Sequence, residues 1–234
     1  MKTMKFGSAS IALVAFALAS AIAPGANAQS AAAPAVKVGD RWVYNVKSGI
    51  GLATTTYQET REVTAVSGGA AKIKVTGKTA DGKDFTRVDD YSAPGTLRSG
   101  ALCYDEAYRF PTPLQRVAFP LAPGQRSSKW VDVVAEPGGA KGKINYYFVT
   151  RSWEKQTTPA GAFDAIRVDV LMVLDDATPF RNATNCNFTY WYSPTAKATV
   201  RERRSAQYMT FDQQAEYRVL EASYELASYT PGKP

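Results

Sequence analysis

Three pairs of adjacent carboxylates are the side chains best suited to acid–base chemistry: Asp89-Asp90, Asp105-Glu106 and Asp175-Asp176. A glycosidase needs two carboxylates placed across a cleft, and an all-β scaffold can supply them. Adjacent residues on a strand, however, point to opposite faces of the sheet, and acidic residues at strand ends are ordinary in solvated turns. The Asp-Asp pairs also lack the alternating spacing of an EF-type calcium loop. A glycosidase without histidine is therefore an alternative function and not the main hypothesis.

Histidine is absent from all 234 residues. Its absence excludes Ser-His-Asp and Cys-His nucleophile systems and most zinc sites. The chain also has no Cys-x-x-Cys motif and no glycine-rich phosphate loop between a strand and a helix. We therefore expect a non-enzymatic protein with no catalytic residues, no bound metal and no cofactor.

Two aromatic segments suggest a ligand-binding surface instead. In residues 144–153 large apolar side chains occupy both faces of the expected strand, and in residues 188–192 Trp191 opposes its aromatic neighbours in the same way. A strand that is apolar on both faces must be covered on both, by the domain core and by a second layer, a closed barrel or an apolar ligand. Tyrosine suits a ligand groove because it combines apolar area with a hydroxyl group. The candidate ligand-binding residues are Tyr146, Phe148, Tyr190 and Tyr192, and the competing interpretation places them in a sandwich core.

A basic cluster, Arg201, Arg203 and Arg204, surrounds Glu202 on a later strand. Such charges commonly protect an exposed edge strand against aggregation. They would equally form a patch that docks anionic headgroups or an acidic partner. The second function that we consider is therefore an interaction module, in which a sheet edge or this strand recruits another envelope protein.

The segments that position these residues have the period-two alternation and glycine turns of β-strands, and helical periodicity is nearly absent. The clearest case is 163–174, in which Ile166, Val168 and Val170 share one face. The expected strands are 41–46, 54–66, 71–76, 85–91, 130–134, 143–156, 163–174, an aromatic strand ending at Ser193-Pro194, 199–209 and 215–228. The proline-rich stretch 92–124 is expected to be a long connection containing short strands. The chain is thus predicted to be all-β, with one domain over residues 38–230, a tail at 231–234, and a highly curved antiparallel sheet that forms a half-barrel, barrel or sandwich.

The strand pattern restarts after residue 124. Trp42 corresponds to Trp130, and the Ile73-x-Val75 pattern corresponds to Ile166-x-Val168. Two interpretations are open: tandem units of about four strands over 38–120 and 124–230, or the shared composition of β-hairpins.

The N-terminus has the features of a secretory signal peptide over residues 1–28. Lys2 and Lys5 precede a short apolar run, and Ala26-Asn27-Ala28 forms a cleavage site. Residues 29–37 are expected to form a flexible leader. The chain carries a formal net charge of +7, and its mildly basic balance gives no reason to expect a nucleic-acid partner. We expect a periplasmic or secreted protein without a transmembrane segment after cleavage; insertion as an outer-membrane barrel is disfavoured because Lys and Arg recur on both faces of several strands.

The chain contains two cysteines, Cys103 and Cys186. In an oxidising compartment an even pair is most simply one disulfide. Two buried free thiols are the alternative, because sequence alone does not show that the two residues approach each other.

The sequence P-A-G-A-F-D-A at 159–165, followed by Y-W-Y-S-P at 190–194, resembles uncharacterised bacterial periplasmic domains in which a P-A-G-x-F turn precedes a long strand. More broadly, the secreted all-β character resembles the periplasmic half-barrel proteins of the LolA/LolB type. That resemblance implies a binding protein for an apolar or amphipathic ligand, of the lipid or lipoprotein acyl chain class, held on a concave face. The helices that cover this face in those carriers have no counterpart here.

Overall fold

The computed structural model describes residues 29–50, 53–79, 82–103, 107–136, 138–175, 182–209 and 216–233. In this part of the chain the secondary structure consists of β-strands, without a helix. The strands are β1 (Arg41–Ile50), β2 (Ala53–Ser67), β3 (Ala70–Lys78), β4 (Asp84–Ala93), β5 (Thr96–Ala101), β6 (Ala107–Gln115), β7 (Arg126–Glu136), β8 (Lys141–Thr158), β9 (Gly161–Asp175), β10 (Thr184–Ser193), β11 (Ala198–Met209) and β12 (Glu216–Thr230). None of the described segments is a helix long and apolar enough to cross a membrane.

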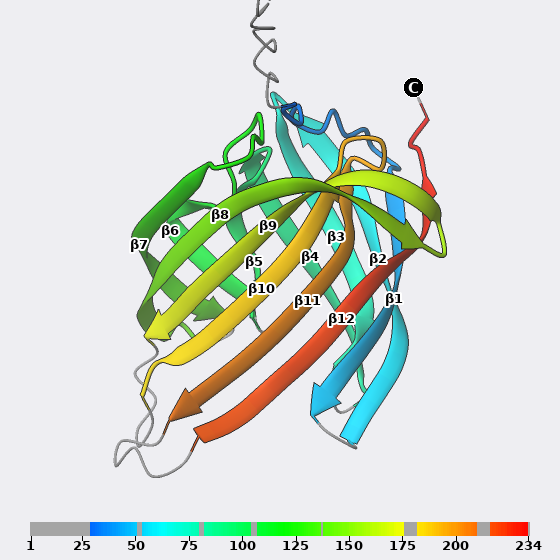
Figure 1. The fold of residues 1–234 in the computed structure, drawn as a ribbon. Coiled ribbons are helices and arrows are strands. Elements are labelled where there is room, and N and C mark those ends of the chain that lie inside the picture. The colour runs from blue at the N-terminus through cyan, green and yellow to red at the C-terminus, as the bar shows by residue number, and fades with distance from the viewer. Residues whose placement is uncertain are drawn as a thin grey trace, which may run out of the picture.

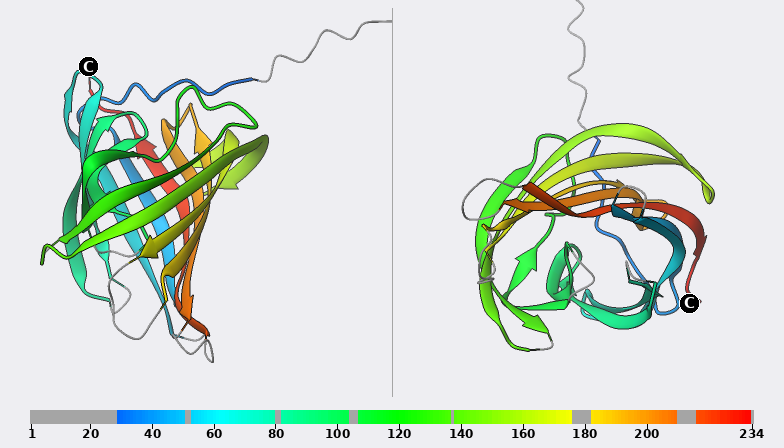
Figure 2. Two further views of the ribbon diagram at one scale, coloured as in Figure 1. Left: turned by 90° about the vertical axis from the view of Figure 1, so that its left-hand side faces the viewer. Right: turned by 90° about the horizontal axis from the view of Figure 1, so that it is seen from below.

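The strands form one closed antiparallel barrel (Figure 1). Each strand pairs with the next along the chain, and β1 also pairs with β12 to close the ring. Figure 2 shows the ring from below, with the strands enclosing an interior. The all-β prediction is therefore confirmed, and of the three architectures expected the closed barrel is the one present. The half-barrel implied by the LolA/LolB resemblance is corrected, because the β1–β12 ladder removes the free edges that a half-barrel keeps.

Residues 92–124, expected to be a long connection containing short strands, contain two strands of the barrel, β5 and β6. The prolines that obscure this region also have a structural effect. β6 pairs with β7 only through Ala107, Tyr108 and Arg109, and Pro111 and Pro113 follow directly. Proline has no backbone N–H to donate, so the ladder ends there. Six strands lie on each side of the connection between β6 and β7; a duplication of one unit stays a prediction.

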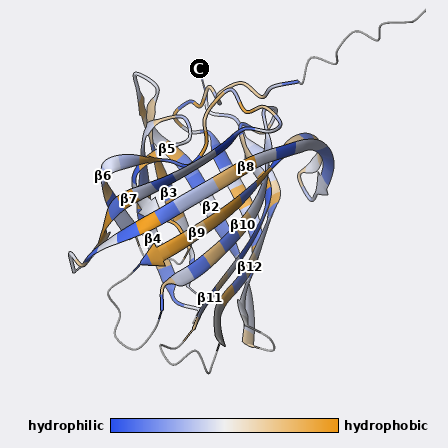
Figure 3. Ribbon diagram, turned by 60° about the vertical axis from the view of Figure 1, so that its left-hand side comes forward, coloured by the Kyte–Doolittle hydropathy of each residue, from blue (hydrophilic) through white to orange (hydrophobic). Residues whose placement is uncertain are grey.

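The interior next to β8, β9 and β10 is filled by a large apolar cluster. Ile144, Met172 and Leu174 have exposed fractions of 0%, 0% and 2% in this cluster. The hydropathy colouring of Figure 3 shows the apolar character concentrated along β9. Cys103 and Cys186 form a disulfide within the same cluster, joining chain segments 83 residues apart. The predicted disulfide is thus confirmed.

The β8–β9 hairpin covers the outward-facing aromatic side chain of β10, whereas the outward-facing Tyr147 and Val149 of β8 stay half-exposed. Its end crosses the outside of the barrel over β11 and β12 (Figure 1), where Ala160 N donates to Leu226 O at 3.1 Å. Beneath it the outward-facing Trp191 is 7% exposed, and its Nε1 donates to Glu154 Oε2 at 2.7 Å. Barrel closure buries the inner face of β10, and the folded hairpin buries Trp191 on its outer face, where Asn187 stays exposed.

The leader 29–37, expected to be flexible, is docked across one end of the barrel (Figure 2). Ala31 pairs with Leu121 through two backbone hydrogen bonds, of 2.7 and 2.8 Å, and is 1% exposed. Trp153 Nε1 donates to Gln29 O at 2.6 Å, and the Tyr192 hydroxyl donates to Ala32 O at 3.3 Å. Barrel residues thus provide hydrogen-bond partners for some of the leader's backbone groups, and the flexibility expected of this segment stays a prediction.

Candidate functional site

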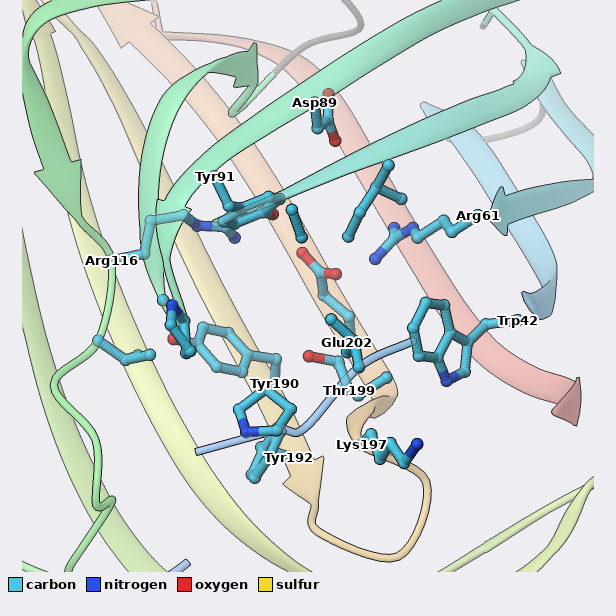
Figure 4. A pocket seen from close by; sticks show the side chains of 18 of the residues that line it. Trp42, Arg61, Asp89, Tyr91, Arg116, Tyr190, Tyr192, Lys197, Thr199 and Glu202 are labelled. Carbon is cyan, nitrogen blue, oxygen red and sulfur yellow. The ribbon is translucent and has the colours of Figure 1, made fainter. Parts of the chain in front are cut away.

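A cavity of about 190 Å³ lies inside the barrel at the end crossed by the leader (Figure 4). Pro34 and Val36 of the leader form part of its wall. Further apolar and aromatic wall residues come from several strands and from the connection after β6: Trp42, Ile73, Val117, Phe119, Leu121, Tyr190 and Tyr192. An interior volume of this size accommodates a group comparable to an aromatic ring or a short piece of alkyl chain.

Charged side chains line the same cavity. They form three short ion pairs inside the barrel: Arg204–Glu202 at 2.6 Å, Arg61–Glu59 at 2.7 Å and Arg87–Asp89 at 2.9 Å. Strand alternation places them there. Glu202 pairs with Tyr190 and Tyr224 of the neighbouring strands, and these tyrosines are themselves buried. The partners of each pair are two residues apart and therefore face the same side of one strand.

Glu202 is the centre of this charged group. Figure 4 shows Arg61 and Arg116 directed toward it from opposite sides. Burial by itself raises the pKa of the Glu202 carboxyl, but Arg204, then Arg61 and Arg116, outweigh it and lower the pKa to about 2. The guanidinium of Arg204 also lies 4.5 Å from the ring centroid of Tyr224. Glu202 is consequently an ionised, hydrogen-bonded carboxylate at neutral pH.

Arg116 differs from the other interior arginines. Among the described residues no carboxylate lies within 4.0 Å of its guanidinium, and its buried Nε has no hydrogen-bond partner there. It hydrogen-bonds the Tyr146 hydroxyl. The pKa of Tyr146 is raised, first by burial, so the phenol is neutral at ordinary pH. Arg116 is therefore a cation in the cavity wall that has no ion-pair partner in the described part of the chain.

The charges around the cavity are consequently unequal in number. Four arginines line it, whereas three carboxylates pair with them. Lys197 also lines the cavity, and its charge is matched by Asp40 at 3.2 Å. Counted over the residues that the structure describes, one positive charge is left in excess beside the cavity, and it belongs to Arg116. Among the described residues no cluster of three or more Cys, Asp or Glu side chains is arranged to hold a metal ion.

The four aromatic residues singled out by sequence all point into the barrel, but into different surroundings. Tyr190 and Tyr192 line the cavity. Tyr146 and Phe148, 3% and 2% exposed, lie in the packed apolar cluster. Tyr146 is connected to the cavity through its hydrogen bond with Arg116. Tyr190 and Tyr192 thus border a cavity, as the ligand-surface interpretation expects. Tyr146 and Phe148 are packed in a core, as the competing interpretation expects.

The three arginines expected to form one anionic-docking patch are separated by strand alternation. Arg203 is exposed, and Arg201 binds Glu225 at 2.8 Å on the outer face. Arg204 points inward to Glu202. The single patch is corrected, because consecutive residues of a strand lie on opposite faces.

The carboxylate pairs follow the same alternation where they are described. Asp89 faces the interior and binds Arg87, whereas Asp90 lies 3.9 Å from the half-exposed Arg98. Asp105, Glu106 and Asp176 lie outside the described residues. The pair Asp89-Asp90 therefore does not share one cleft.

Sequence reasoning missed the interior charges of β2. Tyr57, Glu59, Arg61 and Val63 face inward, but residues 58, 60 and 62 between them are also polar or charged. With polar groups on both faces, the strand has no amphipathic signal that distinguishes its inner side. The small spacing of Glu59 and Arg61, two residues apart, is the one feature that indicates an ion pair on a common face.

No protein-family model matches the chain, and no curated protein matches it. Solved structures with a similar fold include a protein described as exported, with a YmcC-like fold, from Bacteroides fragilis. It shows 15% identity and a TM-score of 0.49, over 86% of this chain and 99% of that chain. A protein described as a lipoprotein from Parabacteroides distasonis shows 14% identity and a TM-score of 0.48, over 86% and 100%. YmcC of Escherichia coli, described as a hypothetical lipoprotein, shows 10% identity and a TM-score of 0.42, over 82% and 85%. None of the three is described as a LolA or LolB protein, and at these values they carry no argument about ligand or activity.

Proposed function

We propose that this chain is a non-enzymatic binding protein that holds a small apolar or amphipathic ligand inside its barrel. The observation that carries the proposal is the cavity of about 190 Å³, lined by aromatic and apolar side chains and bordered by a charged cluster. A concave, mostly apolar site with a few convergent polar groups is the usual form of a small-molecule site. Tyr190 and Tyr192, whose hydroxyl groups accompany apolar rings, form part of its wall.

The cell envelope or the extracellular space is the compartment in which we place this function. The signal-peptide pattern of residues 1–28 supports export. The Cys103–Cys186 disulfide supports an oxidising compartment, because disulfides persist there and are rare in the cytosol.

The state of the interior carboxylates supports a binding role over glycoside hydrolysis. A glycosidase needs a carboxylic acid with a raised pKa that donates a proton near neutral pH. Glu202 has instead a pKa lowered to about 2, and Glu59 and Asp89 are each bound to an arginine. None of the three is arranged as a proton donor.

Native mass spectrometry of protein purified without detergent tests the proposal. We expect an additional mass that disappears after organic extraction and returns when the extract is added back. Cys103 and Cys186 should remain paired, which leaves the protein two hydrogen atoms lighter than the reduced chain. If the protein carries no added mass and binds neither extracted lipids nor a hydrophobic dye, the proposed function is wrong.

A further inference from the structure

The structure also indicates the chemistry of the ligand, an inference that rests on the proposed function and deepens it. We propose that the ligand carries an anionic group, a carboxylate or a phosphate, that binds Arg116 inside the barrel, with its apolar part toward the leader. The residues that carry this inference are Arg116 itself, its tyrosine neighbours, and the apolar wall between Val117 and Leu121.

Arg116 is partly buried, and its Nε atom is fully buried. Each buried guanidinium N–H needs an acceptor, because leaving it without one costs free energy. Arg61, Arg87 and Arg204 each have a carboxylate at 2.9 Å or less. Arg116 has a neutral tyrosine hydroxyl and a buried Nε without an acceptor among the described residues. An anion in the cavity would supply the missing partner.

The guanidinium of Arg116 and the tyrosines beside it suit the geometry of an anionic group. A guanidinium binds a carboxylate or phosphate through two parallel N–H···O bonds, which gives both strength and orientation. Tyr91 and Tyr190 lie close enough to Arg116 to interact with it electrostatically, and both line the cavity. Their hydroxyl groups are donors for the remaining oxygen atoms of such an anion.

The apolar cavity wall next to Arg116 gives the direction of the ligand's alkyl chain. The chain that follows Arg116 supplies Val117, Phe119 and Leu121 to the cavity wall. Phe119 packs edge-on against Tyr192, with ring centroids 5.2 Å apart. The leader residues Pro34 and Val36 complete this side. An amphiphile with its head at Arg116 would therefore place its alkyl chain along these side chains, under the leader.

The test compares three probes with one alkyl chain: decanoate, decyl phosphate and 1-decanol, measured by isothermal titration calorimetry on the full mature protein. We expect the two anions to bind at least about tenfold more tightly than the alcohol, the size expected of charge-assisted hydrogen bonds. The tighter of the two anions identifies the headgroup class. Arg116→Gln should lower the affinity for both anions to that of 1-decanol, and should change the affinity for 1-decanol by less than about twofold.

Arg203→Gln is the matched control, because it removes the same charge from the exposed outer face of β11. It should leave all three affinities unchanged, and Arg116→Lys should retain part of the preference for anions. The comparison of probes on the unmodified protein does not depend on whether any variant folds. Equal binding of decanoate, decyl phosphate and 1-decanol would overturn this inference and leave the proposed function intact. Binding of none of them at millimolar concentration would contradict both.

Discussion

The two sides of the barrel interior are built on the same strand alternation but are filled in opposite ways. Next to β8, β9 and β10 most inward positions are apolar, and Ile144, Met172 and Leu174 lie in one packed cluster. On β2 and β4, and on β11 beside β10, arginines and carboxylates point inward. Alternation decides which residues face the interior, and residue type decides whether that interior is packed or hollow.

The difference follows from the physical demands of the two kinds of side chain. Branched apolar side chains interdigitate at the density of an organic crystal. Arginine–carboxylate pairs must instead keep their hydrogen-bond geometry, because the cost of removing both ions from water is offset only by good pairing. A layer of such pairs cannot collapse onto its neighbours, so space is left between them. The packed side supplies the stability of the barrel, and the charged side supplies the cavity.

Removal of the disulfide should give the largest effect, and it acts on the packed side. Replacing Cys103 and Cys186 by alanine together should lower the free energy of unfolding by about 4 kcal/mol, because the bond closes a loop of 83 residues in the unfolded chain. Urea unfolding followed by tryptophan fluorescence measures this change. A loss below about 1 kcal/mol would mean that the packed side does not depend on this link.

On the charged side, Glu202→Gln should destabilise the protein by about 3 kcal/mol, because it leaves Arg204, and in part Arg61 and Arg116, without their shared anion. Glu225→Gln is the matched variant on the outside. It breaks the 2.8 Å ion pair between Glu225 and Arg201, whose side chains are 44% and 26% exposed respectively. The loss of unfolding free energy should be less than about 1 kcal/mol. Similar losses for the two variants would contradict the view that the interior charges are mutually dependent.

Replacing one isoleucine by alanine on the packed side, and one on the cavity side, compares the two sides directly. Ile144→Ala in the packed cluster should cost about 3 kcal/mol, since Ile144 is 0% exposed and its removal opens a new cavity. Ile73→Ala enlarges a cavity that already exists, and should cost only about 1 kcal/mol. Chemical unfolding of both variants measures the difference. Equal costs would indicate that the cavity is filled by side chains in solution.

The strands could be predicted because they depend on local patterns, and the disulfide could be predicted because the chain has only two cysteines. The alternation of Ile166, Val168 and Val170 is visible in the sequence and corresponds to the core face of β9. Closure of the barrel could not be predicted, because it rests on the β1–β12 ladder between the two ends of the chain. Non-local pairing leaves no periodic trace in either segment.

The candidate site was predicted in part for the same reason. The aromatic residues Tyr190 and Tyr192 are conspicuous in the sequence, and they line the cavity. Arg116 lies in the proline-rich stretch directly after β6, without strand periodicity, and its backbone N–H donates to Gly95 O at 2.8 Å, a contact between separate segments. Sequence patterns detect side chains that repeat along a strand, but not a single residue that a loop turns inward.

The smallest effect that we predict is a pH dependence that distinguishes the two sides. The pKa of Glu202 is lowered from 4.5 to about 2 on folding, so the unfolded chain takes up its proton at a higher pH than the folded protein. Its contribution to stability is therefore fully present above about pH 5 and is lost as the pH falls through the range between 4.5 and 2. Between pH 7 and pH 4 the loss from this group should be about 1 kcal/mol. Asp40 and Asp169, whose pKa values are also lowered, add to the same loss of stability at acidic pH.

Urea midpoints of the unmodified protein and of Glu202→Gln, measured at pH 7 and pH 4, test this prediction. The difference between the two proteins isolates the contribution of the interior carboxylate. Ile144→Ala should keep the full pH dependence of stability, because this substitution removes no titrating group. An unchanged slope in Glu202→Gln would show that the arginines around this carboxylate do not hold it ionised.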